Sequence, residues 1–112
     1  MSEPRAVPLS KTEWADDVPG IRDQAITVEN ARWAVVEYAE GAWREEWCTE
    51  GHRGFVIEGE IEYEFDDGNE PIRVGRGEAF LLPAGSVHRG HNRAAGPTTM
   101  FLIDDPVAPE TA

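Results

Sequence analysis

Short apolar stretches, each closed by a turn signal, fill the middle of the chain and restrict its fold more than any other feature. Residues 60–66 alternate strictly between apolar and acidic side chains, so Ile61, Tyr63 and Phe65 should face a core while the acidic residues face water. The stretch 32–39 has the β-branched and aromatic content of a strand. Further strands are expected at residues 55–57, 72–74, 79–82 and 98–103.

This spacing predicts an all-β protein, because turn signals every 8 to 12 residues or so are typical of antiparallel sandwiches and barrels. About eight strands fit into roughly 80 residues, which matches one antiparallel double-sheet jelly-roll β-barrel. A Greek-key barrel of another kind has the same periodicity and stays open as an alternative. The stretch 55–57 is apolar at three successive positions, which predicts a strand covered on both faces.

Composition divides the chain into three segments. Residues 1–24 contain three prolines among many charged residues and should form a partly ordered N-terminal arm. Residues 25–104 hold the expected strands and should form the single barrel domain. Residues 105–112 should be a frayed C-terminal tail.

The charge balance excludes several kinds of partner. The 112 residues include 22 acidic and 10 basic side chains, which gives a formal net charge of −12. Nucleic-acid phosphates and anionic lipid headgroups would repel such a chain, so neither is expected as a partner. No apolar run approaches the roughly 18 residues needed to cross a bilayer. Cys48 is the single cysteine, which excludes an internal disulfide and favours a cytoplasmic location.

The stretch 77–92 is far more specific than the strand pattern around it. Its fixed positions, separated by five, one, two and three residues, are Gly77, Pro83, Gly85, His88 and Asn92. The two glycines permit positive φ angles or close approach, and the proline suits a strand exit where no backbone donor is needed. This stretch is similar to the complete second sequence motif of the cupin superfamily. The resemblance covers residues 30–103 and implies a small single-domain cupin.

The segment 41–59 resembles the first cupin motif but departs from its usual ligands. The family pattern places two histidines and a glutamate between two glycines. Counted forward from Gly41, the two histidine positions hold Trp47 and Thr49, and neither is a plausible metal ligand.

Counted backward from Gly59, the same pattern puts His52 at the glutamate position and Cys48 and Glu46 at the histidine positions. The backward count is preferred because the strand that leads to Gly59 is fixed by its packing, whereas the preceding loop can vary in length. In cupins the histidine of the second motif, here His88, is a metal ligand. A metal site is therefore predicted from Cys48, His52, His88 and Glu46.

One divalent transition metal is the expected cofactor. A thiolate with two imidazoles favours Zn, with Fe, Ni and Cu as alternatives, whereas Ca and Mg prefer oxygen ligands. The competing interpretation makes Cys48 a small buried apolar residue and His88 a hydrogen-bonded histidine without metal. His91 lies three residues after His88, so it should point to the opposite face of the strand.

The resemblance implies a metal-dependent enzyme that acts on a small organic molecule by dioxygenase, isomerase, epimerase or lyase chemistry. No separate catalytic acid or base is identified. The alternative is a non-catalytic binding module that holds a small ligand for sensing or regulation, and the loss of the histidine pair favours it. The residues expected to line the substrate pocket are Trp47, Arg44, Phe55 and Trp33. A homodimer is expected because small open sheets leave edges that need covering.

Overall fold

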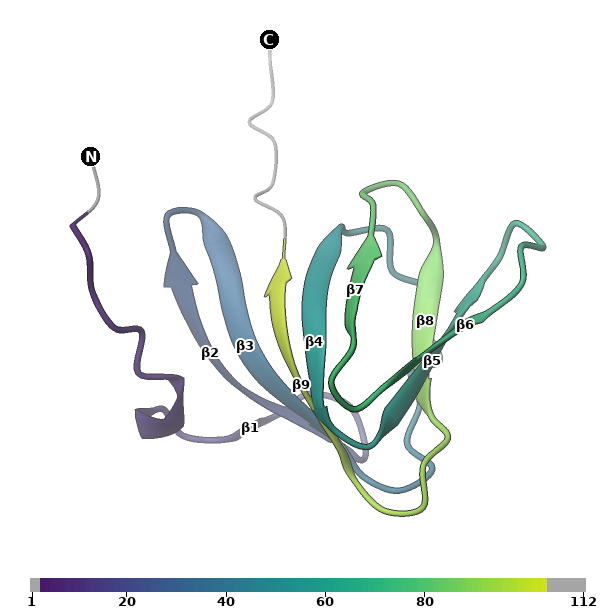
Figure 1. Cartoon of the computed structure of the whole chain (residues 1–112), viewed down its shortest axis with the longest axis horizontal. Coiled ribbons are helices and arrows are strands. Elements are labelled where there is room, and N and C mark those ends of the chain that lie inside the picture. Colours follow the sequence, from purple (N-terminus) through teal and green to yellow (C-terminus); the bar gives the residue numbers. More distant parts are fainter. Residues whose placement is uncertain (1–2, 105–112) are drawn as a thin grey trace, which may run out of the picture.

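The computed structural model describes residues 3–104, which form nine strands in two antiparallel sheets (Figure 1). A 3-10 helix, η1 (Leu9–Lys11), precedes the strands. The strands are β1 (Ala15–Asp16), β2 (Ile21–Val28), β3 (Ala31–Tyr38), β4 (His52–Glu58), β5 (Glu60–Phe65), β6 (Ile72–Gly75), β7 (Ala79–Leu82), β8 (His88–Asn92) and β9 (Thr98–Asp104). Within the described part, no helix is long and apolar enough to cross a membrane.

The strand order confirms the predicted double-sheet jelly roll. The larger sheet has the order β1-β2-β3-β9-β4-β7, and the smaller sheet has the order β6-β5-β8. Strand β9, near the end of the described chain, lies between β3 and β4 and pairs with both (Figure 1). It thereby joins the first three strands to β4 and β7 in one sheet. The two sheets face each other without joining into a closed barrel.

The core lies between the two sheets and takes alternate side chains from each strand. Val36, Val56 and Met100 from the larger sheet meet Ile61 and Tyr63 from the smaller one, and all five are at least 96% buried. The alternation predicted for residues 60–66 is therefore confirmed. Each fully buried side chain of this size contributes about 1.5–3 kcal/mol of hydrophobic stabilisation.

The prediction that residues 55–57 are covered on both faces is wrong. Only Val56 is buried, whereas Phe55 and Ile57 are 43% and 46% exposed. They point away from the core because neighbouring residues of a strand face opposite sides. Among the described residues, no element covers this outer face of β4.

The N-terminal arm packs against its own sheet. Leu9 is buried, and η1 contacts β2 and β3. The side-chain amide of Gln24 donates to the carbonyl of Thr12 at 2.8 Å, and the guanidinium of Arg22 lies 4.3 Å from the ring centroid of Trp14. The predicted boundary at residue 24 falls inside β2, and the predicted tail at 105–112 lies outside the described residues.

Asn92, the last fixed position of the second motif, joins three segments. Its buried amide nitrogen donates to the backbone carbonyls of Tyr38, Ala39 and Gly96 at 3.2, 2.9 and 2.9 Å. Its side-chain oxygen accepts the hydroxyl of Thr98 at 2.8 Å. The motif needs asparagine here because a single side chain must both donate and accept inside the core.

A substitution at Gly85 should destabilise the turn before β8. This glycine has a φ of +90°, and an added Cβ would meet no atom within 4 Å, so backbone strain is the main cost. We expect Gly85→Val to lower the free energy of unfolding by about 1–3 kcal/mol, with a smaller loss for Gly85→Ala. Urea denaturation measures the difference. Gly75→Val, at a glycine without positive φ, is the control, and equal losses at both sites would contradict the turn assignment.

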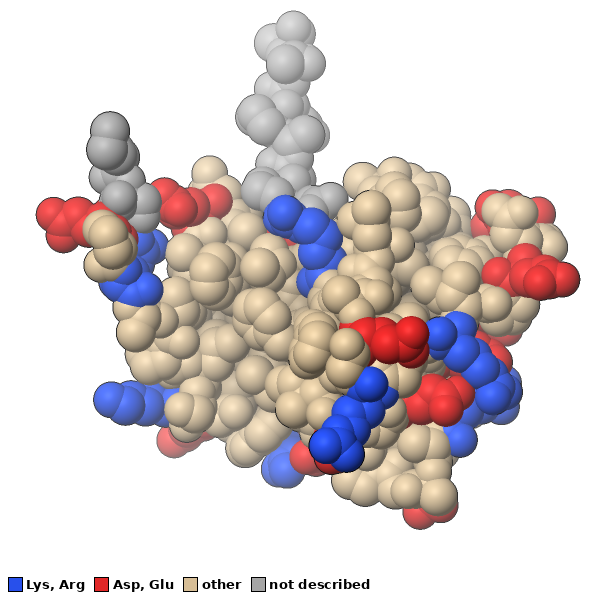
Figure 2. Space-filling model, in the orientation of Figure 1, with Lys and Arg blue, Asp and Glu red and all other residues tan. Residues whose placement is uncertain are grey.

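The expected homodimer stays a prediction, and the structure offers a surface for it. We define the outer patch as Trp33, Phe55, Ile57, Leu81 and Phe101, all on the face of the larger sheet turned away from the core. None of these five side chains is charged, whereas Arg53 lies on the same face, opposite Leu81 and Ile103. Figure 2 shows mostly uncharged surface over β3, with charged side chains nearer β4 and β7. Two copies of a chain with net charge −12 could bury this patch without bringing acidic groups together.

Light scattering at tens of micromolar should therefore give the mass of a dimer. Leu81→Glu should give a monomer, because a charged side chain would be buried in the dimer interface. Its circular dichroism spectrum should be unchanged, because Leu81 is 62% exposed and points away from the core. A monomeric wild-type protein would show that the dimer prediction is wrong.

Candidate metal centre

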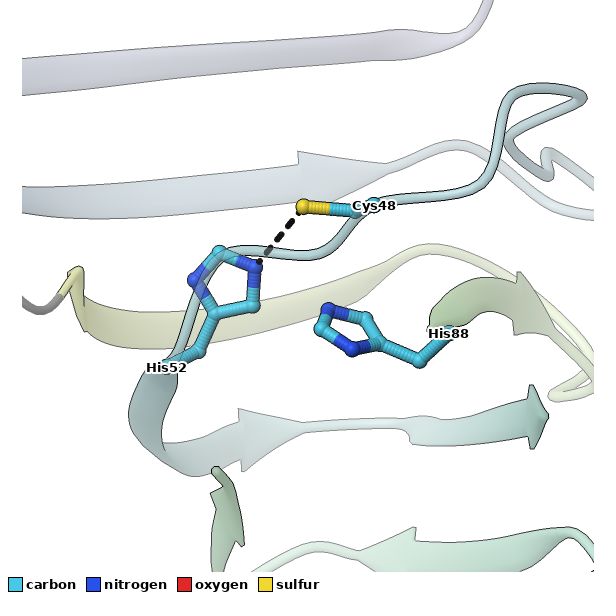
Figure 3. A group of neighbouring side chains, drawn as sticks. All are labelled: Cys48, His52 and His88. Atoms are coloured by element: carbon cyan, nitrogen blue, oxygen red, sulfur yellow. Dashed lines mark hydrogen bonds between the residues drawn. The ribbon is translucent and has the colours of Figure 1, made fainter. Parts of the chain in front are cut away.

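Cys48, His52 and His88 converge at one end of the space between the sheets. One potential ligand atom from each lies within 4.8 Å of the other two. His52 begins β4 of the larger sheet, and His88 begins β8 of the smaller sheet. Cys48 belongs to the loop 39–51, which joins β3 to β4. Figure 3 shows the two imidazole rings and the thiol directed toward one another.

Backbone pairing fixes Cys48 opposite His88. The amide of Cys48 donates to the carbonyl of His88 at 2.8 Å, and the amide of His88 donates to the carbonyl of Cys48 at 2.9 Å. A third bond, from the amide of Arg44 to the carbonyl of Gly90 at 3.1 Å, holds the loop along β8. Residues paired directly in this way project to the same face, so the pairing places the thiol beside the imidazole.

His88 presents a buried nitrogen without a partner. Its Nδ1 lies 2.9 Å from the carbonyl oxygen of Ser86, and because a carbonyl only accepts, Nδ1 carries the proton. Its Nε2 is buried and has no hydrogen-bond partner among residues 3–104. Burial lowers the pKa of His88, and the neighbouring His52 lowers it further. The ring is therefore neutral at pH 7, with the Nε2 lone pair free to bind.

His52 also directs its Nε2 atom toward the space between the three side chains. Its Nδ1 lies 2.7 Å from Oδ1 of Asp104, and its Nε2 lies 3.6 Å from Sγ of Cys48. The two imidazole rings have centroids 5.0 Å apart at an angle of 75°. Burial raises the pKa of the Cys48 thiol, so the protonated thiol donates weakly to Nε2 at neutral pH.

These three residues fit a transition metal. Around a tetrahedral zinc ion, a sulfur and a nitrogen ligand lie about 3.5 Å apart, given Zn–S and Zn–N bonds of about 2.3 and 2.0 Å. The Cys48 Sγ to His52 Nε2 distance of 3.6 Å already matches that separation. The unpartnered Nε2 of His88 supplies a third donor. The set of one thiolate and two imidazoles suits Zn, Fe, Ni or Cu and disfavours Ca and Mg.

The structure does not bring Glu46 into this cluster. Its side chain is exposed, and it lines the same pocket without joining the three converging ligand atoms. Glu46 was expected on the same strand face as Cys48, two residues before it. The loop instead forms isolated β-bridges to β8 at Trp43 and Cys48, without a continuous strand that would keep this alternation.

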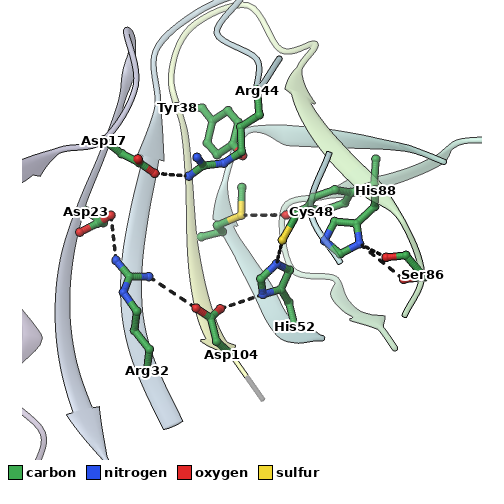
Figure 4. Close-up of polar contacts among 12 residues, drawn as sticks. Asp17, Asp23, Arg32, Tyr38, Arg44, Cys48, His52, Ser86, His88 and Asp104 are labelled. Carbon is green, nitrogen blue, oxygen red and sulfur yellow. Dashed lines mark hydrogen bonds and ion pairs between the residues drawn. The ribbon is translucent and has the colours of Figure 1, made fainter. Parts of the chain in front are cut away.

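A pocket of about 540 Å³ opens over the cluster. Figure 4 shows the polar contacts of several residues that line it. Trp47 and Arg44, two of the residues expected in a substrate pocket, line it. The guanidinium of Arg44 donates to Asp17 at 2.7 Å and to the hydroxyl of Tyr38 at 3.2 Å. The other pocket residues include Asp23, Arg32, Val36, Tyr63, Leu102 and Asp104.

The structure does not place Trp33 or Phe55, the other two residues expected in a substrate pocket, in the lining of this pocket. Both belong to the outer patch, and Trp33 packs edge-on against Phe101 with ring centroids 6.1 Å apart. Phe55 lies three residues after His52 on β4, so strand alternation directs the two side chains to opposite faces. The same rule correctly separates His91 from His88, and His91 stacks on Trp43 instead.

Sequence reasoning missed several polar residues of the site. Asp104, Arg32 and Asp23 form charged contacts along the pocket wall, and Tyr38 and Tyr63 direct hydroxyl groups into the same region. The alternation of 98–103 gives a partial signal for Asp104, since it continues the inward positions of β9. Its partner His52 is 52 residues away, and no local spacing indicates their contact.

Comparison with known proteins assigns the chain to a family. Residues 34–104 match the Cupin domain family, so the chain belongs to the cupins. No curated protein matches the sequence.

Solved structures agree with the fold. KdgF from Halomonas sp. is 22% identical with a TM-score of 0.68, and the match covers 88% of this chain and 92% of that one. A protein of unknown function from Rhizobium leguminosarum is 17% identical with a TM-score of 0.76, covering 95% and 100% of the two chains. The polyketide cyclase RemF from Streptomyces resistomycificus is 15% identical with a TM-score of 0.75, covering 96% and 83%.

Metal affinity should rise with pH. Burial raises the pKa of the Cys48 thiol, so an ion must displace its proton at neutral pH, whereas the neutral His88 releases none. One released proton predicts about tenfold tighter binding per pH unit from about pH 7 to 8.5. Affinity should fall further in acid, where His88 gains its proton only below the ordinary imidazole range because burial lowers its pKa.

Competition of Zn(II) between the protein and a chelator measures this dependence. His91→Ala should leave the curve unchanged, because that ring lies on the other face of β8. His52→Ala and His88→Ala should each lower affinity strongly at every pH. A wild-type affinity that does not change between about pH 7 and 8.5 would contradict thiolate ligation.

Proposed function

We propose that this cupin is a metal-dependent enzyme that acts on a small organic molecule in the pocket. The observation that carries the proposal is the buried Nε2 of His88, which has no partner among the described residues and faces His52 and Cys48. A buried polar atom without a partner costs about 1–3 kcal/mol, and metal coordination would satisfy it. Cys48, His52 and His88 are the residues that would hold the ion.

Three protein ligands are typical of catalytic metal sites, which keep one position open, whereas structural zinc sites use four. When bound there, a divalent transition metal would act as a Lewis acid toward a carbonyl or enolate oxygen of the substrate. Dioxygenase, isomerase, epimerase and lyase reactions are the classes that the proposal covers. The pocket volume of about 540 Å³ lies in the range of small-molecule sites, about 300–1,000 Å³.

The chain's own polar groups would orient the substrate. Burial raises the pKa of Tyr38 and raises that of Tyr63 well above its ordinary value, so both hydroxyls stay protonated and act as hydrogen-bond donors rather than bases. Within residues 3–104, the hydroxyl of Tyr63 has only the thioether of Met100 as an acceptor, at 3.6 Å. A thioether is a weak acceptor, so a substrate oxygen would compete well for this proton.

Arg44 is the group best placed to recognise a substrate carboxylate. Its guanidinium is fixed by Asp17 and Tyr38 and lines the pocket. A planar guanidinium held in this way can pair with a carboxylate through two parallel hydrogen bonds. Val36 and Leu102 supply apolar wall on the side of the larger sheet.

A non-catalytic binding module is the second candidate. The first motif supplies one thiol and one imidazole in place of the family's two histidines and glutamate. The charged groups of the pocket wall are also paired with one another, as in Arg44 with Asp17 and Arg32 with Asp23. A site of this kind could hold a ligand for sensing or regulation without turning it over.

Metal content distinguishes the two candidates. Protein purified without added metal should contain about one transition-metal ion per chain by mass spectrometry, and Cys48→Ser should lose most of it because a hydroxyl is a far poorer ligand than a thiolate. His91→Ala is the control and should keep the metal. Full metal content in Cys48→Ser would make Cys48 a packing residue, and a metal-free wild type after metal supplementation would favour the binding module.

Turnover is the second part of this test. The metal-loaded protein is incubated with a panel of small carboxylic acids, keto acids and sugars, and each is followed by proton NMR. Consumption of one compound that stops on chelation and returns on metal addition supports the enzyme. Binding without consumption supports the module.

A further inference from the structure

We propose that Asp104 is a positioning residue of the metal centre, which directs Nε2 of His52 at the metal through its hydrogen bond to Nδ1. Arg32 holds the carboxylate in place from the other side. This inference rests on the proposed metal site and names residues that neither cupin motif contains.

Sheet register brings the three residues together. Arg32 on β3 pairs with Asp104 on β9, and Asp104 pairs in turn with His52 on β4. Residues directly opposite one another in antiparallel strands project to the same face. We call these side chains the Arg32–Asp104–His52 row, which runs across the inner face of the larger sheet and ends at the cluster (Figure 4).

The contact between His52 and Asp104 fixes which nitrogen faces the metal. Nδ1 and Oδ1 are 2.7 Å apart, and the two side chains are only 13% and 16% exposed. A carboxylate can only accept, so Nδ1 must donate its proton, and the neutral ring then has its lone pair on Nε2. Little water reaches this short bond to compete with it. The ring is thus held in the tautomer and orientation that metal binding requires.

Arg32 restrains the carboxylate in turn. Its Nη1 lies 3.7 Å from Oδ2 of Asp104, and its Nη2 lies 2.9 Å from Oδ2 of Asp23. The two oxygens of Asp104 therefore face different partners, Arg32 on one side and His52 on the other. Rotation of the carboxylate would weaken both contacts, and Asp23 keeps Arg32 from following it.

His88 needs no such side chain. Its Nδ1 donates to the backbone carbonyl of Ser86, in the turn that leads into β8. The Nδ1 of one imidazole is thus held by the main chain, whereas the Nδ1 of the other is held by a side chain, that of Asp104. A change at Asp104 should therefore disturb one ligand and leave the other two in place.

The test measures Co(II) affinity by chelator competition at one fixed pH. Asp104→Asn should weaken binding by about 10–100-fold, the range found when outer partners of a ligating histidine are removed. Arg32→Gln should weaken it less. Asp17→Asn is the matched control, because Asp17 lines the same pocket and pairs with an arginine but touches no ligand, so its affinity should stay within about threefold of wild type. The near-ultraviolet thiolate–Co(II) band should persist in Asp104→Asn, since Cys48 is untouched.

A second measurement needs neither bound metal nor a folded Asp104→Asn variant. Nitrogen-15 NMR of the metal-free wild type should show the His52 proton on Nδ1, and Arg32→Gln should broaden or shift that signal while the His88 signal stays constant. A proton on Nε2 of His52 in the wild type would overturn the inference. Asp104→Asn binding Co(II) within about threefold of wild type would also overturn it. A wild type that binds no Co(II) would instead refute the metal site itself.

Discussion

The pairing of one loop residue with the first residue of β8 is the contact on which the site depends. Two backbone hydrogen bonds between Cys48 and His88 add the loop to the edge of the smaller sheet. These two bonds fix the backbone at Cys48 itself, and so they hold the thiol at one point beside His88. Because both bonds join backbone atoms, they fix the path of the loop but do not restrict which side chains it carries.

A cluster of aromatic and charged side chains holds the same loop from outside. The guanidinium of Arg89 lies 4.0 Å from the ring centroid of Trp47 and 5.3 Å from that of Trp43. Its Nη1 also donates to the carbonyl of Glu45 at 2.9 Å, and its Nε pairs with Glu64. Each cation–π contact at a partly exposed site contributes about 0.5–1 kcal/mol. The attachment of the loop thus explains why Trp43 and Trp47 lie exposed on the surface.

The sequence predicted the parts of the fold and site that depend on local periodicity. Alternation placed Ile61 and Tyr63 in the core, and counting back along the rigid strand from Gly59 found both Cys48 and His52. Phe55 was misplaced because apolar character indicates a strand residue without indicating its face. Its odd separation from His52 carried the missing information, since residues three apart on a strand point to opposite sides. The contact of Asp104 with His52 could not be predicted, because it arises only when β9 inserts between β3 and β4.

Because the two sheets do not join into a closed barrel, a metal ion bound at the site would also affect the stability of the whole fold. His52 belongs to the larger sheet and His88 to the smaller one, and within residues 3–104 no strand of one sheet pairs with a strand of the other. An ion held by both histidines would cross-link the two sheets in a chain whose single cysteine cannot form an internal disulfide. By mass action, a ligand present at 100 times its dissociation constant stabilises the folded state by about 2.7 kcal/mol. The supply of metal in the cell would then set how much intact protein the cell contains, as well as its chemistry.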